Sequence, residues 1–278
     1  MHTIRSLPAL RTALSALRAD GGRIAFVPTM GALHDGHLTL VRAAKALAAH
    51  VIVSIFVNPT QFGPSEDLDA YPRQEAADAA LLLAEGTAIL WAPDVATMYP
   101  TGHATRIRVD GLPDHLCGAA RPGHFDGVAT IVAKLFNQVA PDVALFGEKD
   151  WQQLAIIRQM ARDLDFTLDI IGVPTVREED GVARSSRNAY LTATERASAA
   201  SIPLAMNRAA QDIRDGVAVG AALFAAKQTL LSAGFVSIDY CELRDGTTLA
   251  LLDEPSPDAR LFLAARIGST RLIDNIAV

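Results

Sequence analysis

The chain has 278 residues, of which 50% are apolar and 20% charged, so it is long enough for one large domain or two ordinary ones with a buried core. This composition excludes a disordered chain, and the formal net charge of −6 argues against a general nucleic-acid-binding protein, which usually carries a basic face. The two cysteines, Cys117 and Cys241, have no metal-binding spacing, which favours a reduced cytoplasmic protein. No apolar run approaches the ~18 residues of a membrane span, so we expect a soluble protein.

The first part of the chain alternates short apolar runs with helical patterns. Leucines at helical spacing predict a helix over 6–20 with Ser6 as its N-cap. Apolar runs predict five strands, at 23–27, 51–57, 88–91, 142–146 and 168–173. Further helices are expected from residue 38, from about residue 71, after residue 125 and over 151–164. This order predicts a parallel sheet with helices on both faces, a Rossmann-like α/β domain over 1–175.

The order of elements changes after residue 175. Thr192 and Glu195 have the spacing of a capping box, which predicts a long helix to about residue 215. A second helix is expected over 218–233, followed by strands at 238–243, 260–265 and 271–275. Helices grouped before strands predict a smaller α+β domain over 176–278.

The stretch V-P-T-M-G-A-L-H-D-G-H at 27–37 joins the first predicted strand of the sheet to a helix. Gly31 and Gly36 allow a ligand to approach the backbone, and the free N–H groups at a helix start attract an anion such as phosphate. His34 and His37 lie on one face of the first helical turn, so both can donate hydrogen bonds to one phosphoryl group. The pattern indicates attack on a nucleotide α-phosphate. Ordinary turn glycines with exposed histidines are the alternative.

Other polar residues follow the predicted strands, at the edge where parallel sheets bind ligands. Asn58 and Gln61 follow the strand at 51–57, although an Asn-Pro turn is the plain alternative. Arg121 offers a planar fork for a carboxylate or phosphate, or else it is a surface arginine. Lys149 is placed to meet a phosphate as a point charge. Asp150 has capping-box spacing to the glutamine three residues later, so a structural role competes with ligand binding there.

Two loops complete the set of candidates. The segment A-R-S-S-R-N at 183–188 places two hydroxyls beside two guanidinium groups, which suits a triphosphate, whereas alone it is typical of a basic surface turn. The acidic segment 63–69 is expected to be a mobile loop that closes over a substrate, although most such loops are solvated connections.

These motifs form an ordered set that resembles one family. The set contains P-T-M-G-A-L-H-D-G-H at 28–37, F-V-N-P-T-Q-F at 56–62, Y-P-R at 71–73, R-P-G-H-F-D-G-V at 121–128, F-G-E-K-D at 146–150, Q-Q-L at 152–154, S-S-R-N at 185–188 and R-L-I-D-N at 271–275. Together they resemble the pantothenate synthetases, or pantoate–β-alanine ligases, of the nucleotidylyltransferase superfamily. The resemblance covers essentially the whole chain.

The resemblance implies an ATP- and Mg²⁺-dependent ligase that condenses pantoate with β-alanine through a pantoyl adenylate and releases AMP and pyrophosphate. It places the chain in pantothenate biosynthesis, which supplies a coenzyme A precursor. It also implies a cytoplasmic homodimer with small-molecule substrates and no nucleic-acid or membrane partner.

The resemblance also assigns roles to residues of this chain. It makes His37, His34 and Lys149 catalytic, with the two histidines stabilising the α-phosphoryl transition state. The residues implied to bind ATP are Met30, Gly31, Ala32, Leu33, His34, Asp35, Gly36, His37, Gly147, Glu148, Lys149, Asp150, Val176, Arg184, Ser185, Ser186 and Arg187. The residues implied to bind pantoate or β-alanine are Gln61, Gln153, Asn58, Tyr71 and Arg121. Arg184 stands where the family pattern has Leu or Met. Mg²⁺ is expected to be bound mainly through the ATP phosphates.

Other classes stay open on the residues alone. A nucleotidyltransferase that moves AMP or CMP onto a phosphate acceptor uses the same kind of histidine turn, and a nucleotide sensor binds ATP without pyrophosphate exchange. A tRNA synthetase is disfavoured by the short acidic chain. Pyrophosphate exchange that depends on pantoate separates the ligase from these alternatives.

Overall fold

The computed structural model describes the whole chain except residues 20, 65 and 67. The expected helix end at Asp20 and the loop residues Ser65 and Asp67 therefore lie outside the described residues. The chain forms two compact units. The first contains Met1–Asp110, Arg121–Glu148 and Gln153–Pro174, and the second contains Gly111–Ala120, Lys149–Gln152 and Thr175–Val278. The predicted boundary between a domain over 1–175 and a smaller domain over 176–278 stays a prediction.

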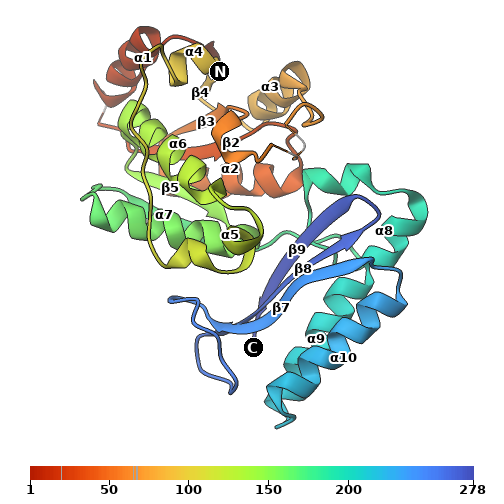
Figure 1. Ribbon diagram of the computed structural model, residues 1–278. Helices are drawn as coiled ribbons and strands as arrows, with labels where there is room; N and C mark the ends of the chain where they lie inside the picture. The colour runs from red at the N-terminus through yellow and green to blue at the C-terminus, as the bar shows by residue number, and fades with distance from the viewer. Residues whose placement is uncertain (20, 65, 67) are drawn as a thin grey trace. The chain divides into compact units, whose positions relative to one another are not determined.

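The first unit is built on a parallel sheet (Figure 1). Its strands are β1 (His2–Ile4), β2 (Ile24–Thr29), β3 (His50–Ile55), β4 (Ile89–Trp91), β5 (Val143–Gly147) and β6 (Asp169–Val173), in the order β1-β4-β3-β2-β5-β6. All neighbouring pairs are parallel, which confirms the expected sheet. Strand β1 was not predicted, because it is a three-residue edge strand with two exposed residues and no apolar pattern.

Strand β2 lies inside this sheet and shows why both faces must be covered. Ile24, Ala25, Phe26 and Val27 are all fully buried, and successive side chains of a strand point to opposite faces. On one face Ala25 and Val27 belong to a core cluster with apolar residues of α2 (Asp35–Leu47). The centre of the sheet is therefore rigid, and the turn after β2 starts from a fixed point.

Four other helices of the first unit follow the predicted order with shifted ends. They are α1 (Leu7–Ala19), α3 (Glu75–Ala84), α6 (His124–Val139) and α7 (Trp151–Asp163), whose first two residues belong to the second unit. The short helix α4 (Val95–Met98) was not predicted. Helix α3 begins at Glu75, later than the expected start near Tyr71-Pro72. Short 3-10 turns follow β3 and β5, η1 (Pro59–Gln61) and η3 (Glu148–Asp150).

The second unit contains an antiparallel sheet of β7 (Ser237–Asp245), β8 (Ala259–Ile267) and β9 (Thr270–Ala277), in that order. Helices α9 (Ser201–Arg214) and α10 (Val219–Ser232) share one apolar core with this sheet. Its shorter helices are α5 (Leu116–Ala120), α8 (Ala193–Ala199), η2 (Leu112–Asp114) and η4 (Ser186–Tyr190). This arrangement confirms the predicted α+β class.

The single helix expected over 192–215 is wrong, because the segment forms α8 and α9. The predicted capping box is present, with Thr192 Oγ1 accepting from the Glu195 N–H and the Glu195 carboxylate accepting from the Thr192 N–H. The break comes at Ala200. Pro203 has no N–H to donate to a carbonyl one turn earlier, and a new helix start places it in a first turn, where that N–H is not needed. No helix among the described residues is long and apolar enough to cross a membrane.

Candidate active site

The turn from β2 to α2 has an unusual backbone that two side chains hold in place. Gly31 has φ +83° and Ala32 has φ +53°, both in the left-handed region. A Cβ at Gly31 would lie 3.1 Å from the Asp78 carboxylate and from Ile55, so the glycine is required on two grounds. Thr29 Oγ1 accepts from the Gly31 N–H at 3.2 Å. The backbone conformation is therefore fixed before His34, the first histidine of the turn.

Asp78 of α3 was not identified from the sequence, yet it organises this turn. Its side chain is buried, and its two oxygens accept from the N–H groups of Ala32 and Leu33, each at 2.9 Å. A buried carboxylate that accepts two backbone hydrogen bonds is a strong fixed contact. The only signal in the sequence is one acidic residue within the apolar run A-A-D-A-A-L-L-L, which is not specific.

His34 and His37 bind each other's backbone at the start of α2. His34 is the N-cap, and its Nδ1 accepts from the Gly36 N–H at 3.1 Å, while His37 Nδ1 accepts from the His34 N–H at 3.3 Å. The ring centroids are 4.1 Å apart. Because each Nδ1 is an acceptor, each neutral ring carries its proton on Nε2, the nitrogen that can donate to a phosphate oxygen. Two neighbouring N–H donors thus come from one capping box.

Gly36 is explained by the same contact. A Cβ at this position would lie 2.8 Å from Cε1 and 2.9 Å from Nδ1 of His34, so any side chain would displace the capping ring. The expected anion site at the start of α2 stays a prediction, but several backbone N–H groups of the turn are already used within the protein. The N–H groups of Ala32 and Leu33 donate to Asp78, and those of His34 and Gly36 donate to the histidine rings. The Nε2 atoms of the two imidazoles are therefore candidate donors of this turn.

Asn58 and Gln61, which follow β3, meet Met30 of the turn. Gln61 Nε2 donates to Met30 Sδ at 3.0 Å, and Gln61 Oε1 accepts from Asn58 Nδ2 at 3.1 Å. Asn58 is 1% exposed, and it also bonds to Gly127 and Tyr99. The Asn58 amide is thus used within the protein, where it orients Gln61. Its place beside pantoate stays a prediction.

Arg121, predicted to bind a substrate, forms a network with the loop at 63–69. Its Nε and Nη2 donate to the two carboxylate oxygens of Glu66 at 2.7 and 2.5 Å, and its Nη1 lies 3.0 Å from His124 Nε2. These hydrogen bonds hold the pKa of Glu66 below its usual value. His124 Nδ1 lies 2.7 Å from the Gln61 carbonyl oxygen, to which it donates. Arg121 and His124 therefore fix the backbone of Gln61.

The remaining substrate candidates are Tyr71 and Gln153. Tyr71 is buried, and its ring makes an edge contact with Phe62, with centroids 5.9 Å apart. Gln153 is partly buried on α7. Its neighbour Gln152 has a structural role, since it accepts from the Cys117 N–H and donates to two carbonyls of the 111–120 segment. The two adjacent glutamines thus have different environments.

The second unit carries the other predicted phosphate ligands on two segments. Lys149 lies in η3 after β5, with Gly147 and Glu148 before it, and its Nζ is 3.9 Å from Asp150 Oδ1. The second segment is a hairpin over 176–184, in which the Arg184 N–H donates to the Val176 carbonyl at 2.9 Å.

The hairpin leads directly into the S-S-R motif. Ser185 is the N-cap of η4, and its Oγ accepts from the Arg187 N–H at 3.3 Å. Asn188 Nδ2 donates to the Ala183 carbonyl at 3.1 Å, which closes the loop on its base. Ser186 and Arg187 therefore lie in a short helical turn with a fixed start.

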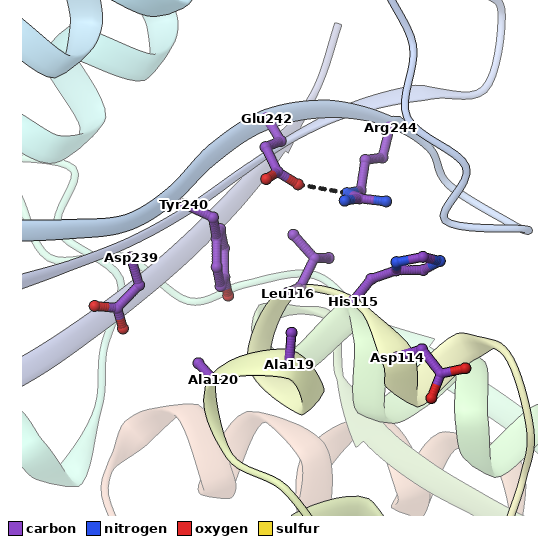
Figure 2. Close-up of a pocket in the computed structure, with 9 residues that line it drawn as sticks. All are labelled: Asp114, His115, Leu116, Ala119, Ala120, Asp239, Tyr240, Glu242 and Arg244. Atoms are coloured by element: carbon purple, nitrogen blue, oxygen red, sulfur yellow. Dashed lines mark hydrogen bonds and ion pairs between the residues drawn. The ribbon is translucent and has the colours of Figure 1, made fainter.

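No cluster of three or more His, Cys, Asp or Glu side chains suited to a metal ion occurs in the described part of the chain. A pocket of about 350 Å³ in the second unit is lined by Asp114, His115, Leu116, Ala119, Ala120, Asp239, Tyr240, Glu242 and Arg244 (Figure 2). Figure 2 shows Glu242 and Arg244 paired above it. The pocket contains none of the residues predicted to bind ATP, pantoate or β-alanine.

Comparison with known proteins gives one consistent result. The family model for pantoate-beta-alanine ligase matches residues 2–277. The chain is 62% identical to the pantothenate synthetase of Sphingopyxis alaskensis over all of both chains. It matches the crystal structure of pantothenate synthetase from Thermus thermophilus with a TM-score of 0.94 and 45% identity, over 99% of each chain.

A second solved structure is the pantoate-beta-alanine ligase of Francisella tularensis, complexed with beta-gamma ATP and beta-alanine. The match has a TM-score of 0.85 and 35% identity, and it covers 100% of this chain and 97% of that one. The parallel sheet, the histidine turn after β2 and these matches over the full length lead to one conclusion. The chain belongs to the pantoate-beta-alanine ligase family.

Proposed function

We propose that this ligase makes pantothenate in two steps, with the histidine turn acting in the first. In the first step a pantoate carboxylate oxygen attacks the α-phosphorus of ATP, the bond to the β-phosphate oxygen breaks, and pyrophosphate leaves. In the second step the β-alanine amine attacks the acyl carbon of pantoyl adenylate, AMP leaves, and the nitrogen loses a proton. The overall reaction is the ATP-dependent formation of pantothenate that the family name describes.

The two-step order has a chemical reason. A carboxylate does not react with an amine at neutral pH, because its negative charge and poor leaving group prevent attack at carbon. A mixed anhydride with AMP supplies a good leaving group before the amine arrives. This intermediate must be kept from water, a role we assign to the loop at 63–69, which Glu66 attaches to Arg121.

The observation that carries this proposal is the reciprocal cap of His34 and His37. It fixes both rings in the tautomer with the proton on Nε2, and it holds them side by side on a rigid turn. Charge builds on the oxygens of the α-phosphoryl group during attack, and preorganised N–H donors stabilise that charge without reorganising. We assign this role to His37 and His34.

The other predicted ligands of ATP keep their assignments as proposals. On the first unit these are Met30, Gly31, Ala32, Leu33, Asp35, Gly36, Gly147 and Glu148. On the second unit they are Lys149, Asp150, Val176, Arg184, Ser185, Ser186 and Arg187. Lys149 supplies a point charge for a phosphate, and Arg187 a planar fork. The N–H groups of Ala32 and Leu33 already donate to Asp78, so these two residues contribute shape rather than hydrogen bonds.

Pantoate is proposed to bind Gln61 and Gln153, whose amides can both donate to its carboxylate and accept from its hydroxyls. Asn58 supports Gln61 through the side chain, and Arg121 supports it through the backbone. Tyr71 is proposed to contribute apolar contact to the pantoate or β-alanine site.

Mg²⁺ is proposed to enter as a complex with ATP. Most of the polar side chains proposed to bind ATP carry imidazole, ammonium, hydroxyl or guanidinium groups, which suit phosphate oxygens. Asp35, Glu148 and Asp150 carry carboxylates, the ligands that a hard cation prefers. A magnesium ion held by the phosphates fits this donor set. A homodimer and a cytoplasmic location are further proposals that follow from family membership.

The test is exchange of labelled pyrophosphate into ATP. We expect exchange only when pantoate is present, with no requirement for β-alanine, because adenylation is reversible and precedes the amine. Exchange at the same rate with and without pantoate would be consistent with nucleotidyl transfer, but it would contradict pantoate as the group that is activated. A complete absence of exchange, beside ATP binding, would indicate a sensor instead.

A further inference from the structure

The motif R-L-I-D-N at 271–275 ends in two buried polar residues that the reaction scheme above does not use. Asp274 and Asn275 are each 3% exposed and are neighbours on β9. Successive side chains of a strand point to opposite faces, so the two residues can reach different segments of the second unit. Buried polar groups have hydrogen-bond partners, and those partners indicate what the pair does.

Asn275 holds the backbone of Lys149. Its Nδ2 donates to the Lys149 carbonyl at 2.9 Å, and its Oδ1 accepts from Arg260 Nη1 at 2.5 Å. The Arg260 guanidinium stacks on the ring of Trp151, 3.5 Å from the centroid, and Trp151 Nε1 donates to the Gly246 carbonyl at 2.6 Å. The segment that carries Lys149 is therefore attached to the sheet of the second unit at two points.

Asp274 holds the hairpin that leads into the S-S-R motif. Its two oxygens accept from Nη1 and Nη2 of Arg177 at 2.7 and 2.9 Å. Arg177 Nη1 also donates to the Gly181 carbonyl at 2.9 Å, and Arg177 pairs with Ala183 across the hairpin. The Asp274 side chain is 1% exposed and the Arg177 side chain 28%, so the carboxylate end of this pair is shielded from water. Ser185, the first residue of the S-S-R motif, follows Ala183 by two positions.

We propose that Asp274 and Asn275 are positioning residues for the adenylation step. Asn275 fixes the main chain of Lys149, and Asp274 acts through Arg177 on the hairpin before Ser185. Because adjacent residues of one strand cannot move independently, β9 sets both segments in a common register. The inference rests on the proposed function, in which Lys149 and 185–187 bind the ATP phosphates.

The sharpest variant is Asn275→Asp. A carboxylate has nearly the shape of the amide and keeps an acceptor for Arg260, but it removes the N–H that donates to the Lys149 carbonyl. We expect kcat/KM for ATP in pantoate-dependent pyrophosphate exchange to fall about 10- to 100-fold, the scale of a displacement of roughly 1 Å. The KM for pantoate should change less than about twofold, because the substitution alters none of the residues proposed to bind pantoate.

A matched control exists at the other end of β9. Arg271 Nε donates to Asp239 at 2.6 Å, and the two side chains are 14% and 18% exposed. Asp239→Asn removes this Asp–Arg pair from the same sheet and leaves the contacts of Asn275 in place. We expect a lower melting temperature with parental kinetics for ATP. If Asn275→Asp behaves like this control, the strand end is only structural and the proposal is wrong.

Arg177→Lys provides a second variant in case Asn275→Asp does not fold. It leaves β9 unchanged and keeps the charge, but it gives up the two-point contact with Asp274. We expect the KM for ATP to rise about threefold, with little change for pantoate. Unchanged ATP kinetics would contradict the role given to Asp274. The parent protein is assayed in the same experiment. Pyrophosphate exchange by the parent without pantoate would contradict the proposed function, independently of the result for the variant.

Discussion

The two segments predicted to bind phosphate are held in different ways. In the first unit, the turn before α2 is held partly by its own side chains, since His34 and His37 each accept from a backbone N–H of the motif, and partly by Asp78 of α3. In the second unit, Ser185 caps its own helical turn, but the hairpin before it is held by Asp274, 97 positions away from Arg177.

The two segments differ in whether the contacts that support a motif come from the motif itself or from distant residues. The histidine turn carries part of its own support in its two histidine rings, so a substitution inside the motif should damage it directly. The S-S-R segment depends on β9, so distant substitutions should weaken it while the motif itself stays intact. Substitutions inside the histidine turn and at its remote contacts test how much of the support of this turn is local.

Gly36→Ala should have the largest effect. The new Cβ would overlap the ring of His34, which must leave its capping position. We expect adenylation to fall about 100-fold, while loss of the cap lowers stability by only about 1 kcal/mol. Pyrophosphate exchange and chemical denaturation measure the two effects.

Gly220→Ala is the control for that substitution. Gly220 lies in α10 with nothing within 4 Å of the added atom, so alanine should be neutral or slightly stabilising there. Parental exchange rates in Gly36→Ala would show that the position of the His34 ring does not matter.

Asp78→Asn should have a smaller effect on the same turn. One oxygen of the amide can still accept a backbone hydrogen bond, but its NH₂ group faces the other N–H, leaving a buried donor without its acceptor. We expect a loss of about 1–3 kcal/mol of stability and a fall in adenylation of about tenfold. Urea denaturation and exchange assays measure both.

Glu75→Gln on the same helix is the control. Glu75 pairs with Arg5 at the surface, with side chains 43% and 61% exposed, and such pairs are worth about 1 kcal/mol or less. Equal effects of the two variants would mean that Asp78 does not organise the turn.

Glu66→Gln should have the smallest effect, because it touches the histidine turn only through Arg121 and the Gln61 backbone. We expect the KM for pantoate to rise about threefold, with the KM for ATP unchanged. Steady-state assays at fixed concentrations of the other substrates test this. A rise in the KM for ATP alone would place the loop at a different substrate.

The same ion pair has a defined pH dependence. Arg121 lowers the pKa of Glu66, so the contribution of the pair to stability is present above the ordinary pKa of glutamate and is lost as the pH falls through the lowered value. The difference in melting temperature between the parent and Glu66→Gln should therefore be constant from pH 6 to 8 and shrink at acid pH, below about 4. A difference that grows on acidification would contradict this pairing.

The sequence was sufficient wherever a local pattern decides the structure. The buried strand β2, the helix after it and the capping box of Thr192 and Glu195 depend on neighbours within a few positions. The break between α8 and α9 was missed although Pro203 marks it, because the alanine-rich pattern around it is continuous.

The residues that support the site could not be predicted, because their partners are remote. Asp78 meets Leu33 from 45 positions away, and Asn275 meets Lys149 from 126 positions away. The use of backbone N–H groups by the histidine rings could not be predicted for a related reason. The spacing of His34 and His37 predicts that they share a face, but it does not show that their rings accept the helix's own N–H groups.

The most direct test of the catalytic role of the turn compares two substitutions of His37 in the two half-reactions. His37→Gln keeps a residue that commonly completes a capping box at this position, and His37→Ala removes both the cap and the ring. If His37 stabilises charge at the α-phosphate, both variants should lose roughly 10²–10³ in adenylation rate, the usual scale for one donor.

The second half-reaction uses prepared pantoyl adenylate and β-alanine in a rapid-quench experiment. Here the amine attacks an acyl carbon and the phosphate only departs, so both variants should react at rates much nearer the parent. Equal losses in the two steps, or adenylation restored by His37→Gln, would contradict the account, since His37 would then hold AMP throughout or serve only as a cap.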